Sequence, residues 1–193
     1  MNLILSSCDF GNPSSAKIIY DNLPKPISKC KVLYFPNEKA TQEKIESGKY
    51  KSRLAAFGFQ KNNIYVANYY QPESIFHVDV DVIYISGGNT FGTMKRIRES
   101  GLDQVILNLV RNGATYIGGS AGAHIATADL SHVTKYDQDT FGLTDFSGLG
   151  LYKGILICHY SDGRKEDLEH LRSSGVYDVQ ALSDQDSIVV KKT

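Results

Sequence analysis

The sequence predicts an α/β fold with a doubly wound, mostly parallel sheet and helices on both faces. Short apolar runs alternate with longer segments of helical spacing through residue 128, which is the pattern of strands joined by crossover helices. The run at residues 81–85 is almost continuously apolar, as expected of a parallel strand covered on both faces. Glycine-rich segments follow two of these runs, at residues 86–90 and 118–122. In such sheets, ligands bind at the carboxyl ends of the strands.

The apolar runs and their flanking turn residues place each element along the chain. Strands are expected at residues 2–6, 31–35, 64–67, 81–85 and 114–117, and helices at 14–23, 41–59, 91–99, 102–112 and 123–128. After residue 128 we expect a polar loop at 131–150, a strand at 151–159, a helix at 166–173, and strands at 179–182 and 187–190 joined by the turn 183–186. Because no repeat or linker interrupts this series, residues 1–193 are expected to form a single domain.

Composition argues against several classes of function. The 193 residues carry 21 basic and 21 acidic side chains, so the formal net charge is zero and neither nucleic acid nor an anionic membrane is an expected partner. The three cysteines are an odd number without paired spacing, which favours a reducing compartment. No signal peptide or membrane-spanning run is recognised. We therefore expect a cytoplasmic protein, either a monomer or a homodimer.

One glycine-rich segment has the pattern of a nucleophile elbow. Residues 114–117 form a strand-like run that enters Gly118-Gly-Ser-Ala-Gly122, and a helix-competent segment follows. A serine in G-x-S-x-G between a strand and a helix is held on a strained turn that exposes its hydroxyl, and glycine neighbours permit close backbone approach. The pattern predicts Ser120 as a nucleophile. A glycine-rich turn with Ser120 as a helix N-cap is the structural alternative.

A serine nucleophile needs a general base, and the chain offers five histidines. His159 is the preferred candidate because it ends the strand expected at 151–159, on the sheet edge where Ser120 should lie. His124 is four residues beyond Ser120 on the same helix and points along that helix, which is a poor direction for a base. Surface positions are expected for the other three, His77, His132 and His170.

The base in turn needs an acid to orient it. Asp184, in the turn between the last two expected strands, is the first choice, and Asp186 in the same turn is the second. Asp137 and Asp139, in the loop before the strand that carries His159, remain alternatives. Aspartate is also common in turns for reasons of backbone hydrogen bonding alone.

The developing oxyanion needs two hydrogen-bond donors. The backbone N–H of Ala121, directly after the serine, is one candidate, and an N–H of Gly88 or Gly87 on the neighbouring glycine-rich turn is the other. Asn89 is expected to hold this second turn through side-chain hydrogen bonds.

Three features together resemble the peptidase E family. They are Gly87-Gly-Asn-Thr-Phe91, Gly118-Gly-Ser-Ala-Gly122, and His159 at a strand end before a helix that contains arginine. These serine peptidases are related to cyanophycinase, and their fold is shared with class I glutamine amidotransferases and is flavodoxin-like. The resemblance implies Ser120 as nucleophile and His159 as base. It implies an acid at the position of Asp184, where the family's dipeptidases carry glutamate.

The resemblance also implies an oxyanion hole formed by Gly88 and Ala121. The family's best-known activity removes N-terminal aspartate from dipeptides, so Arg164 is expected to pair with a substrate carboxylate, and Asn89 and Thr90 to belong to the substrate site. The segment at residues 157–160 reads Ile-Cys-His-Tyr, where many relatives have proline before the histidine. This departure bears on aspartyl specificity more than on the triad.

Other functions are weighed against a peptidase of short peptides. An esterase or acyl transferase could use the same triad, and a non-catalytic binding protein could use the same fold. An amidotransferase would need cysteine at position 120. A dinucleotide is disfavoured because Gly87-Gly88 lacks the G-x-G-x-x-G spacing. No cofactor and no metal are expected, since Cys158 and His159 are adjacent on a strand and point to opposite faces.

Overall fold

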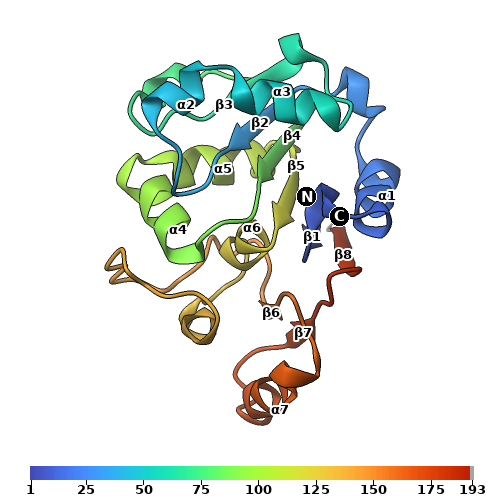
Figure 1. The fold of residues 1–193 in the computed structure, drawn as a ribbon, viewed down its shortest axis with the longest axis vertical. Helices are drawn as coiled ribbons and strands as arrows, with labels where there is room; N and C mark the ends of the chain where they lie inside the picture. The colour runs from blue at the N-terminus through green and yellow to red at the C-terminus, as the bar shows by residue number, and fades with distance from the viewer. Residues whose placement is uncertain (192–193) are drawn as a thin grey trace.

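The computed structural model describes residues 1–191, and its centre is a six-stranded sheet in the order β3-β2-β4-β5-β1-β8 (Figure 1). Neighbouring strands from β3 to β1 are parallel, and β8 runs antiparallel to β1 at the edge. The strands are β1 Asn2–Ser6, β2 Val32–Phe35, β3 Ile64–Val66, β4 Val82–Ile85, β5 Thr115–Gly119 and β8 Ser187–Lys191. The mostly parallel sheet predicted from the sequence is confirmed.

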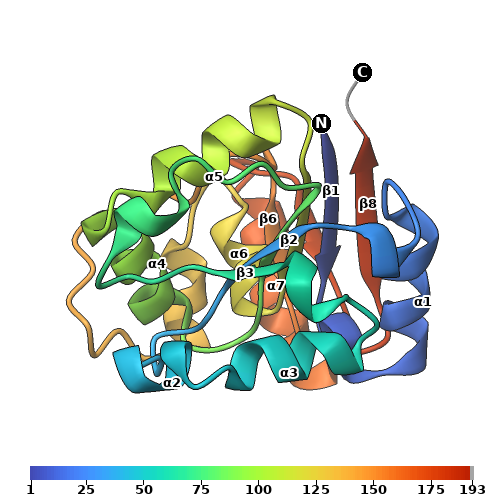
Figure 2. The same cartoon turned by 90° about the horizontal axis from the view of Figure 1, so that it is seen from above.

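Helices cover both faces of this sheet (Figure 2). On one face α1 (Pro13–Asn22) and α3 (Lys49–Ala56) bury Ile19 and Leu54 against alternate strand residues. The other face carries α4 (Thr90–Glu99), α5 (Leu102–Arg111) and α6 (Ala121–Ile125). Within β1, Ile4 packs on the face that carries α1 and α3, and Leu3 packs on the face that carries α4, α5 and α6. Successive side chains of a strand point to opposite faces.

The prediction of a single helix over residues 41–59 is wrong. The segment forms α2 (Gln42–Glu46) and α3, separated by Ser47 and Gly48. Gly48 has φ 75°, a left-handed conformation that ends a helix and that glycine adopts without steric cost. The helix α1 begins at Pro13, after the N-cap Asn12, whose Oδ1 accepts the Ser15 N–H at 3.0 Å.

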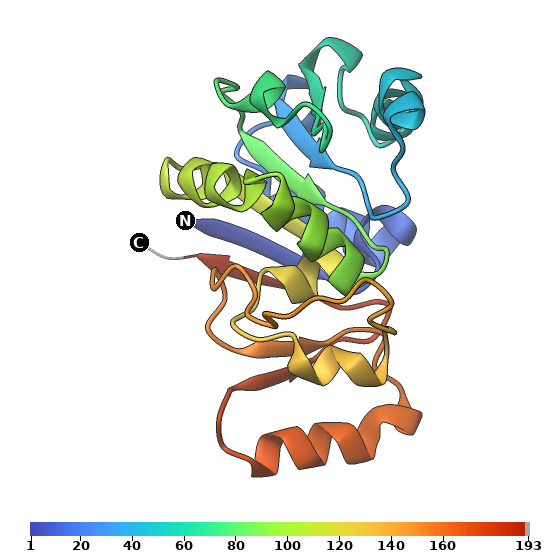
Figure 3. The ribbon, with the colours of Figure 1, turned by 90° about the vertical axis from the view of Figure 1, so that its left-hand side faces the viewer.

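A second, smaller unit follows the main sheet along the chain. Its strands β6 (Ile155–Ile157) and β7 (Val179–Ala181) pair in parallel, and α7 (Lys165–Ser173) connects them. Figure 3 shows α7 at the end of the molecule, beyond these strands. Leu168 of α7 packs on Ile155, Ile157 and Val179. The strand expected at 151–159 is therefore limited to three residues, and His159 lies two residues past its end.

Short 3₁₀ turns link the larger elements, at Asp9–Gly11, Ile27–Lys29, Lys61–Asn63, Pro72–Ile75, Ser131–Lys135 and Asp162–Arg164. The polar loop expected at 131–150 contains one of these turns and packs along α4. Arg98 of α4 donates to the Ser147 carbonyl oxygen at 2.6 Å, and Lys95 donates to the Phe141 carbonyl oxygen at 2.7 Å. Among residues 1–191, we find no helix with the length and apolar character needed to span a bilayer.

Candidate active site

Ser120 sits on the sharp turn between β5 and α6. Its backbone has φ 48° and ψ −106°, a conformation that residues other than glycine rarely adopt. The Ser120 N–H donates to the Ser6 carbonyl oxygen at 2.8 Å, which ties the turn to the end of β1. The G-x-S-x-G pattern predicts a strained strand-to-helix turn at this position, and we refer to residues 118–122 as the elbow.

The glycines on either side of Ser120 are required by close packing. A Cβ on Gly119 would lie 2.1 Å from Oδ2 of Asp9, and a Cβ on Gly122 would lie 2.1 Å from the carbonyl oxygen of Ile85. Both distances are far below van der Waals contact. The elbow can therefore approach β4 and the turn after β1 only because these side chains are absent.

A continuous chain of hydrogen bonds joins Ser120, His159 and Asp184. Ser120 Oγ lies 2.8 Å from His159 Nε2, and His159 Nδ1 lies 2.6 Å from Asp184 Oδ1. Both distances are within the range of strong hydrogen bonds. The order along the chain, Ser…His…Asp, is the one expected from the sequence.

The three alternative acids are engaged elsewhere. Asp186 accepts the Ser183 N–H at 2.8 Å and closes its own turn. Asp137 accepts the Thr90 N–H at 2.8 Å, and Asp139 accepts the N–H groups of Phe141 and Leu143 within its own loop. Of the four aspartates considered from the sequence, the geometry brings Asp184 to His159.

His159 and Asp184 are held from β1 and its following turn. The His159 backbone has φ 52°, and its N–H donates to Ser7 Oγ at 2.8 Å. The Asn12 side chain donates to the Asp184 carbonyl oxygen at 2.5 Å. The hydrogen bond from His159 holds the pKa of the Asp184 carboxyl below its usual range, so this carboxylate stays ionised at neutral pH. Both side chains remain accessible, at 41 % exposed for His159 and 61 % for Asp184.

His124 lies behind the elbow and has a different place from His159. It is buried, and burial lowers its pKa to about 3. Its Nε2 accepts the Cys158 N–H at 3.4 Å, and its Nδ1 lies 3.4 Å from Thr90 Oγ1. A neutral imidazole here bridges the start of α4 to the residue before His159. Its placement away from the serine hydroxyl agrees with the sequence argument against His124 as base.

The glycine-rich turn before α4 lies against Ser120. A Cβ on Gly87 would sit 3.4 Å from the Ser120 Cβ, so the two turns face each other as expected. Within residues 1–191 the N–H groups of Gly88 and Ala121 donate no hydrogen bond. The buried Glu38 supports the turn, since its Oε2 accepts the Asn89 N–H at 2.9 Å.

Two residues of the expected substrate site serve the fold instead. Thr90 is fully buried, so its side chain is not exposed to a ligand beside Ser120. Asn89 Oδ1 caps α4 by accepting the Gly92 N–H at 2.9 Å, and its Nδ2 donates to the Gln138 carbonyl oxygen at 2.9 Å. The expected loop-holding role of Asn89 is therefore confirmed, while both ends of its amide are occupied.

Arg164 is also engaged by the chain itself. Its guanidinium donates to the Cys158 carbonyl oxygen and stacks on the Tyr136 ring, with 4.1 Å between the guanidinium carbon and the ring centroid. It does not line the pocket at Ser120. This arrangement does not support the expectation that Arg164 binds a substrate carboxylate. The hydrogen bond to Cys158 instead holds the backbone beside His159.

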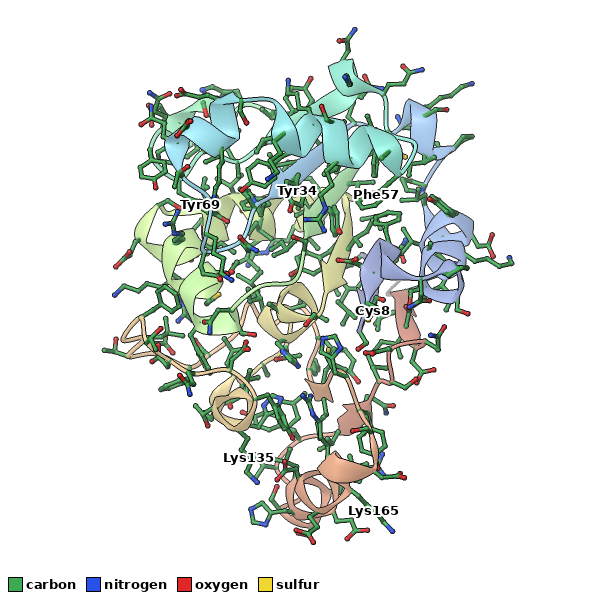
Figure 4. All side chains as sticks on the ribbon, viewed as in Figure 1. Cys8, Tyr34, Phe57, Tyr69, Lys135 and Lys165 are labelled. Carbon is green, nitrogen blue, oxygen red and sulfur yellow. The ribbon has the colours of Figure 1, made fainter. Side chains whose placement is uncertain are left out.

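The pocket at Ser120 has a volume of about 270 Å³ and is lined by Ser7, Cys8, Asp9, Arg53, Gly87, Ser120 and His159. Cys8 lies on the turn that follows β1 (Figure 4). No residue of the loop 131–150 is among these lining residues, because that loop packs on α4.

Sequence reasoning missed the two charged residues of this pocket, Asp9 and Arg53. The Asp9 carboxylate accepts from the Tyr84 hydroxyl at 2.9 Å and from the Phe10 N–H at 2.7 Å, and burial raises its pKa. The position of Asp9 after the first strand could have indicated its place at the sheet edge. Arg53 lies within α3, and no local pattern distinguishes it.

The chain is similar to proteins of a known peptidase family. Residues 3–193 match the profile of peptidase family S51, so the chain belongs to that family. It is 36% identical over 88 residues to peptidase E of Citrobacter koseri, a match covering 46% of this chain and 38% of that protein. It is 33% identical over 84 residues to the uncharacterized peptidase Lmo0363 of Listeria monocytogenes, covering 42% and 41%. These matches span less than half of either relative's length.

Solved structures confirm the fold. A crystal structure of a candidate peptidase E protein from Listeria monocytogenes EGD-e superposes with a TM-score of 0.75 at 22% identity, covering 98% of this chain and 93% of that one. A peptidase from an acI-B1 Actinobacterium gives a TM-score of 0.65 at 17% identity, covering 98% and 83%. The predicted α/β class and the resemblance to the peptidase E family are thus both confirmed.

Proposed function

We propose that this protein is a serine peptidase that hydrolyses short peptides with Ser120, His159 and Asp184 as its catalytic triad. The observation that carries the proposal is the hydrogen-bond chain from Ser120 Oγ through His159 to Asp184, on an elbow whose backbone is strained. Membership of family S51 supports the same chemistry. A serine hydroxyl is a weak nucleophile at neutral pH, and this arrangement supplies both the base and its orienting group.

In the first half of the reaction Ser120 Oγ attacks the carbonyl carbon of the scissile peptide bond. His159 Nε2 takes the hydroxyl proton and then delivers it to the leaving amine, which departs as the acyl-enzyme forms. The Asp184 carboxylate accepts the hydrogen on Nδ1, which keeps Nε2 unprotonated in the resting state and stabilises the imidazolium once formed. Water then attacks the acyl-enzyme with His159 again as base.

The N–H groups of Gly88 and Ala121 are the proposed oxyanion donors. Their lack of an intramolecular acceptor within residues 1–191 leaves them available to a substrate oxygen. The contact between the Gly87 and Ser120 turns supports a shared oxyanion site for the two donors. Each such donor contributes on the order of 3 kcal/mol to transition-state stabilisation.

The charges of the pocket suggest which peptides fit. Asp9 offers a carboxylate and Arg53 a guanidinium within the same small cavity. A peptide with N-terminal aspartate presents its ammonium and its side-chain carboxylate close together, and opposite charges at those separations attract. We therefore propose dipeptides and other short peptides as substrates, with N-terminal aspartyl dipeptides first among them, and Arg53 in the place that the sequence assigned to Arg164.

We further propose that residues 1–193 act as one domain in the cytoplasm, as a monomer or homodimer and without nucleic acid or membrane as partner. The described cysteines Cys8, Cys30 and Cys158 form no disulfide, which fits a reducing compartment. The zero net charge offers no attraction for polyanions.

The test is hydrolysis of a panel of dipeptides and chromogenic amides and esters. We expect turnover of Asp-Xaa dipeptides that is lost in Ser120→Ala. In Arg53→Gln we expect KM for Asp-Xaa to rise about tenfold, the loss of one charge-assisted contact, while neutral dipeptides change little. Arg111→Gln, on the exposed surface of α5, is the matched control.

Turnover of esters without turnover of any peptide would replace the peptidase by an esterase with the same triad. No turnover of any substrate, with an unreactive Ser120, would favour a binding protein. An equal KM in Arg53→Gln and wild type would remove Arg53 from the substrate site.

A further inference from the structure

Beside the triad, the structure assembles a set of metal-binding atoms that comes from three separate segments of the chain. The Cys8 sulfur, a ring nitrogen of His159 and a carboxylate oxygen of Asp184 all lie within 4.8 Å of one another. Cys8 follows β1, His159 follows β6, and Asp184 lies between β7 and β8. Sulfur, imidazole nitrogen and carboxylate oxygen are the ligands that bind Zn²⁺ in proteins.

We propose that Cys8, His159 and Asp184 bind Zn²⁺ or a similar thiophilic divalent cation, and that the bound ion switches the peptidase off. The inhibitory part rests on the proposed function, whereas the binding part does not. No metal is expected from the sequence because the adjacent residues Cys158 and His159 cannot share an ion. The ligand set proposed here is brought together by the fold.

The geometry is close to what the ion needs. Zn²⁺ binds sulfur at about 2.3 Å and nitrogen or oxygen at about 2.0–2.2 Å in a tetrahedral arrangement, so ligand atoms must approach within about 4 Å of one another. Asp184 is 61 % exposed and His159 41 % exposed, and the half-exposed Cys8 lines the pocket. Side-chain rotation can therefore close the site, and solvent gives the ion access.

The charge beside Cys8 favours a cation. The Asp184 carboxylate lies within 4.8 Å of the Cys8 sulfur, and a negative charge at that distance attracts a divalent ion. Cys30 and Cys158 are buried away from solvent, so of the chain's cysteines Cys8 is the one positioned for this role.

Binding at Nδ1 would remove the base without displacing Ser120. In the resting state Nδ1 carries the hydrogen that faces Asp184, and Nε2 faces the serine hydroxyl. When the metal takes the Nδ1 lone pair, the ring's one hydrogen moves to Nε2, which can then no longer accept the serine proton. The Cys8 thiol loses its proton to solvent as the sulfur–metal bond forms. No oxidation or reduction takes place.

The test uses Co²⁺ as a spectroscopic probe and Zn²⁺ as inhibitor, on the full chain. We expect one Co²⁺ to bind per chain with a thiolate-to-Co²⁺ charge-transfer band, and Zn²⁺ to displace it. In Cys8→Ser the band disappears, and Zn²⁺ binding weakens by tenfold or more, roughly the loss expected when a ligand group is removed. Cys30→Ser, a control that removes a thiol elsewhere, retains the band.

Activity is measured in parallel as the fraction of each variant's own rate. We expect Zn²⁺ to inhibit wild type and Cys30→Ser, a chelator to restore the rate, and Cys8→Ser to need at least about ten times more Zn²⁺. Absence of the thiolate band at saturating Co²⁺, or equal Zn²⁺ affinity in Cys8→Ser, overturns the site. A band with full turnover at saturating Zn²⁺ overturns the inhibition. A band in a protein without turnover on any peptide leaves the site standing and overturns the peptidase proposal.

Discussion

Ser120 and the two side chains linked to it by hydrogen bonds, His159 and Asp184, are positioned in different ways. Ser120 lies between β5 and α6 on a turn whose neighbours, Gly119 and Gly122, are buried in contact with other backbone and side-chain atoms. His159 and Asp184 lie in exposed segments that follow β6 and β7 and are held by a few hydrogen bonds from Ser7 and Asn12. Packing therefore fixes Ser120, whereas individual hydrogen bonds fix His159 and Asp184.

Backbone strain is confined to the place where these two parts meet. Among residues 1–191, the non-glycine residues with positive φ are Asp9, Ser120 and His159, and all three line the same pocket. Each such conformation costs on the order of 1–3 kcal/mol and persists only where its surroundings enforce it. The difference between the two parts predicts that changes at the elbow affect folding and chemistry together, while changes at Asp184 affect chemistry alone.

The largest effect is expected from Ser120→Ala. Loss of the attacking oxygen should lower kcat by roughly 10⁴- to 10⁶-fold, as in other serine hydrolases. The measurement is steady-state hydrolysis of the preferred dipeptide. Because alanine is smaller than serine, the melting temperature should stay within a few degrees. Retention of more than a tenth of the activity would remove Ser120 from the mechanism.

Asp184→Asn should lower kcat by about 10²- to 10⁴-fold, because the amide favours the wrong tautomer of His159. Asp186→Asn is the matched control in the same turn, where the carboxylate accepts the Ser183 N–H and does not meet His159. Kinetics and denaturant unfolding of both variants separate chemistry from folding. Equal losses of activity in the two variants would contradict the assignment of Asp184.

Gly122→Ala tests the packed part of the site. The added Cβ would lie 2.1 Å from the Ile85 carbonyl oxygen, so the backbone of the elbow or of β4 has to move. We expect a loss of about 3 kcal/mol in the free energy of unfolding, the upper end for overpacking, together with reduced activity. Gly163→Ala is the control, since its Cβ would meet nothing closer than 3.9 Å. Equal urea midpoints for the two variants would show that the elbow is not tightly packed.

A smaller effect is expected on the pH dependence of stability through His124. Burial lowers its pKa to about 3 in the folded chain, against about 6.5 when unfolded. Between these values the unfolded chain binds more protons, so the free energy of unfolding falls as the pH drops, by up to about 1.4 kcal/mol per pH unit. His132, which was expected at the surface, is buried instead, and its pKa is also lowered, so it adds to this trend.

Urea unfolding at pH 7, 5.5 and 4.5 measures this slope. In His124→Gln it should be shallower than in wild type, whereas His77→Gln, an exposed control, should leave it unchanged. An identical slope in His124→Gln and wild type would show that this histidine is already protonated in the folded chain.

Features that depend on consecutive residues could be predicted from the sequence. The strands of the main sheet follow from local apolar runs, and the elbow follows from five consecutive residues, so both could be read directly. The break at Gly48 was missed because the apolar residues of α3 continue the helical spacing across it. The placement of His159 near Ser120 follows from the rule that strand ends gather at one sheet edge, and that of Asp184 from its position in the last turn.

Side-chain direction could not be predicted in this way. Thr90 points into the core and Arg164 onto Tyr136, although both lie near the site in the sequence pattern. Arg53 reaches the pocket from α3, on a segment that carries no motif. Such contacts depend on how distant elements pack. The catalytic roles of the triad remain predictions until they are measured.

The most direct test of the central claim is covalent labelling of Ser120 by a fluorophosphonate, followed by peptide mapping. We expect one adduct per chain, located on Ser120, with labelling slowed at least about 100-fold in His159→Ala because the base is removed. Ser120→Ala should take up no label, although Ser7 lies in the same pocket. Absence of an adduct on Ser120 in the folded wild-type protein, or labelling at an equal rate without His159, would contradict an activated serine nucleophile.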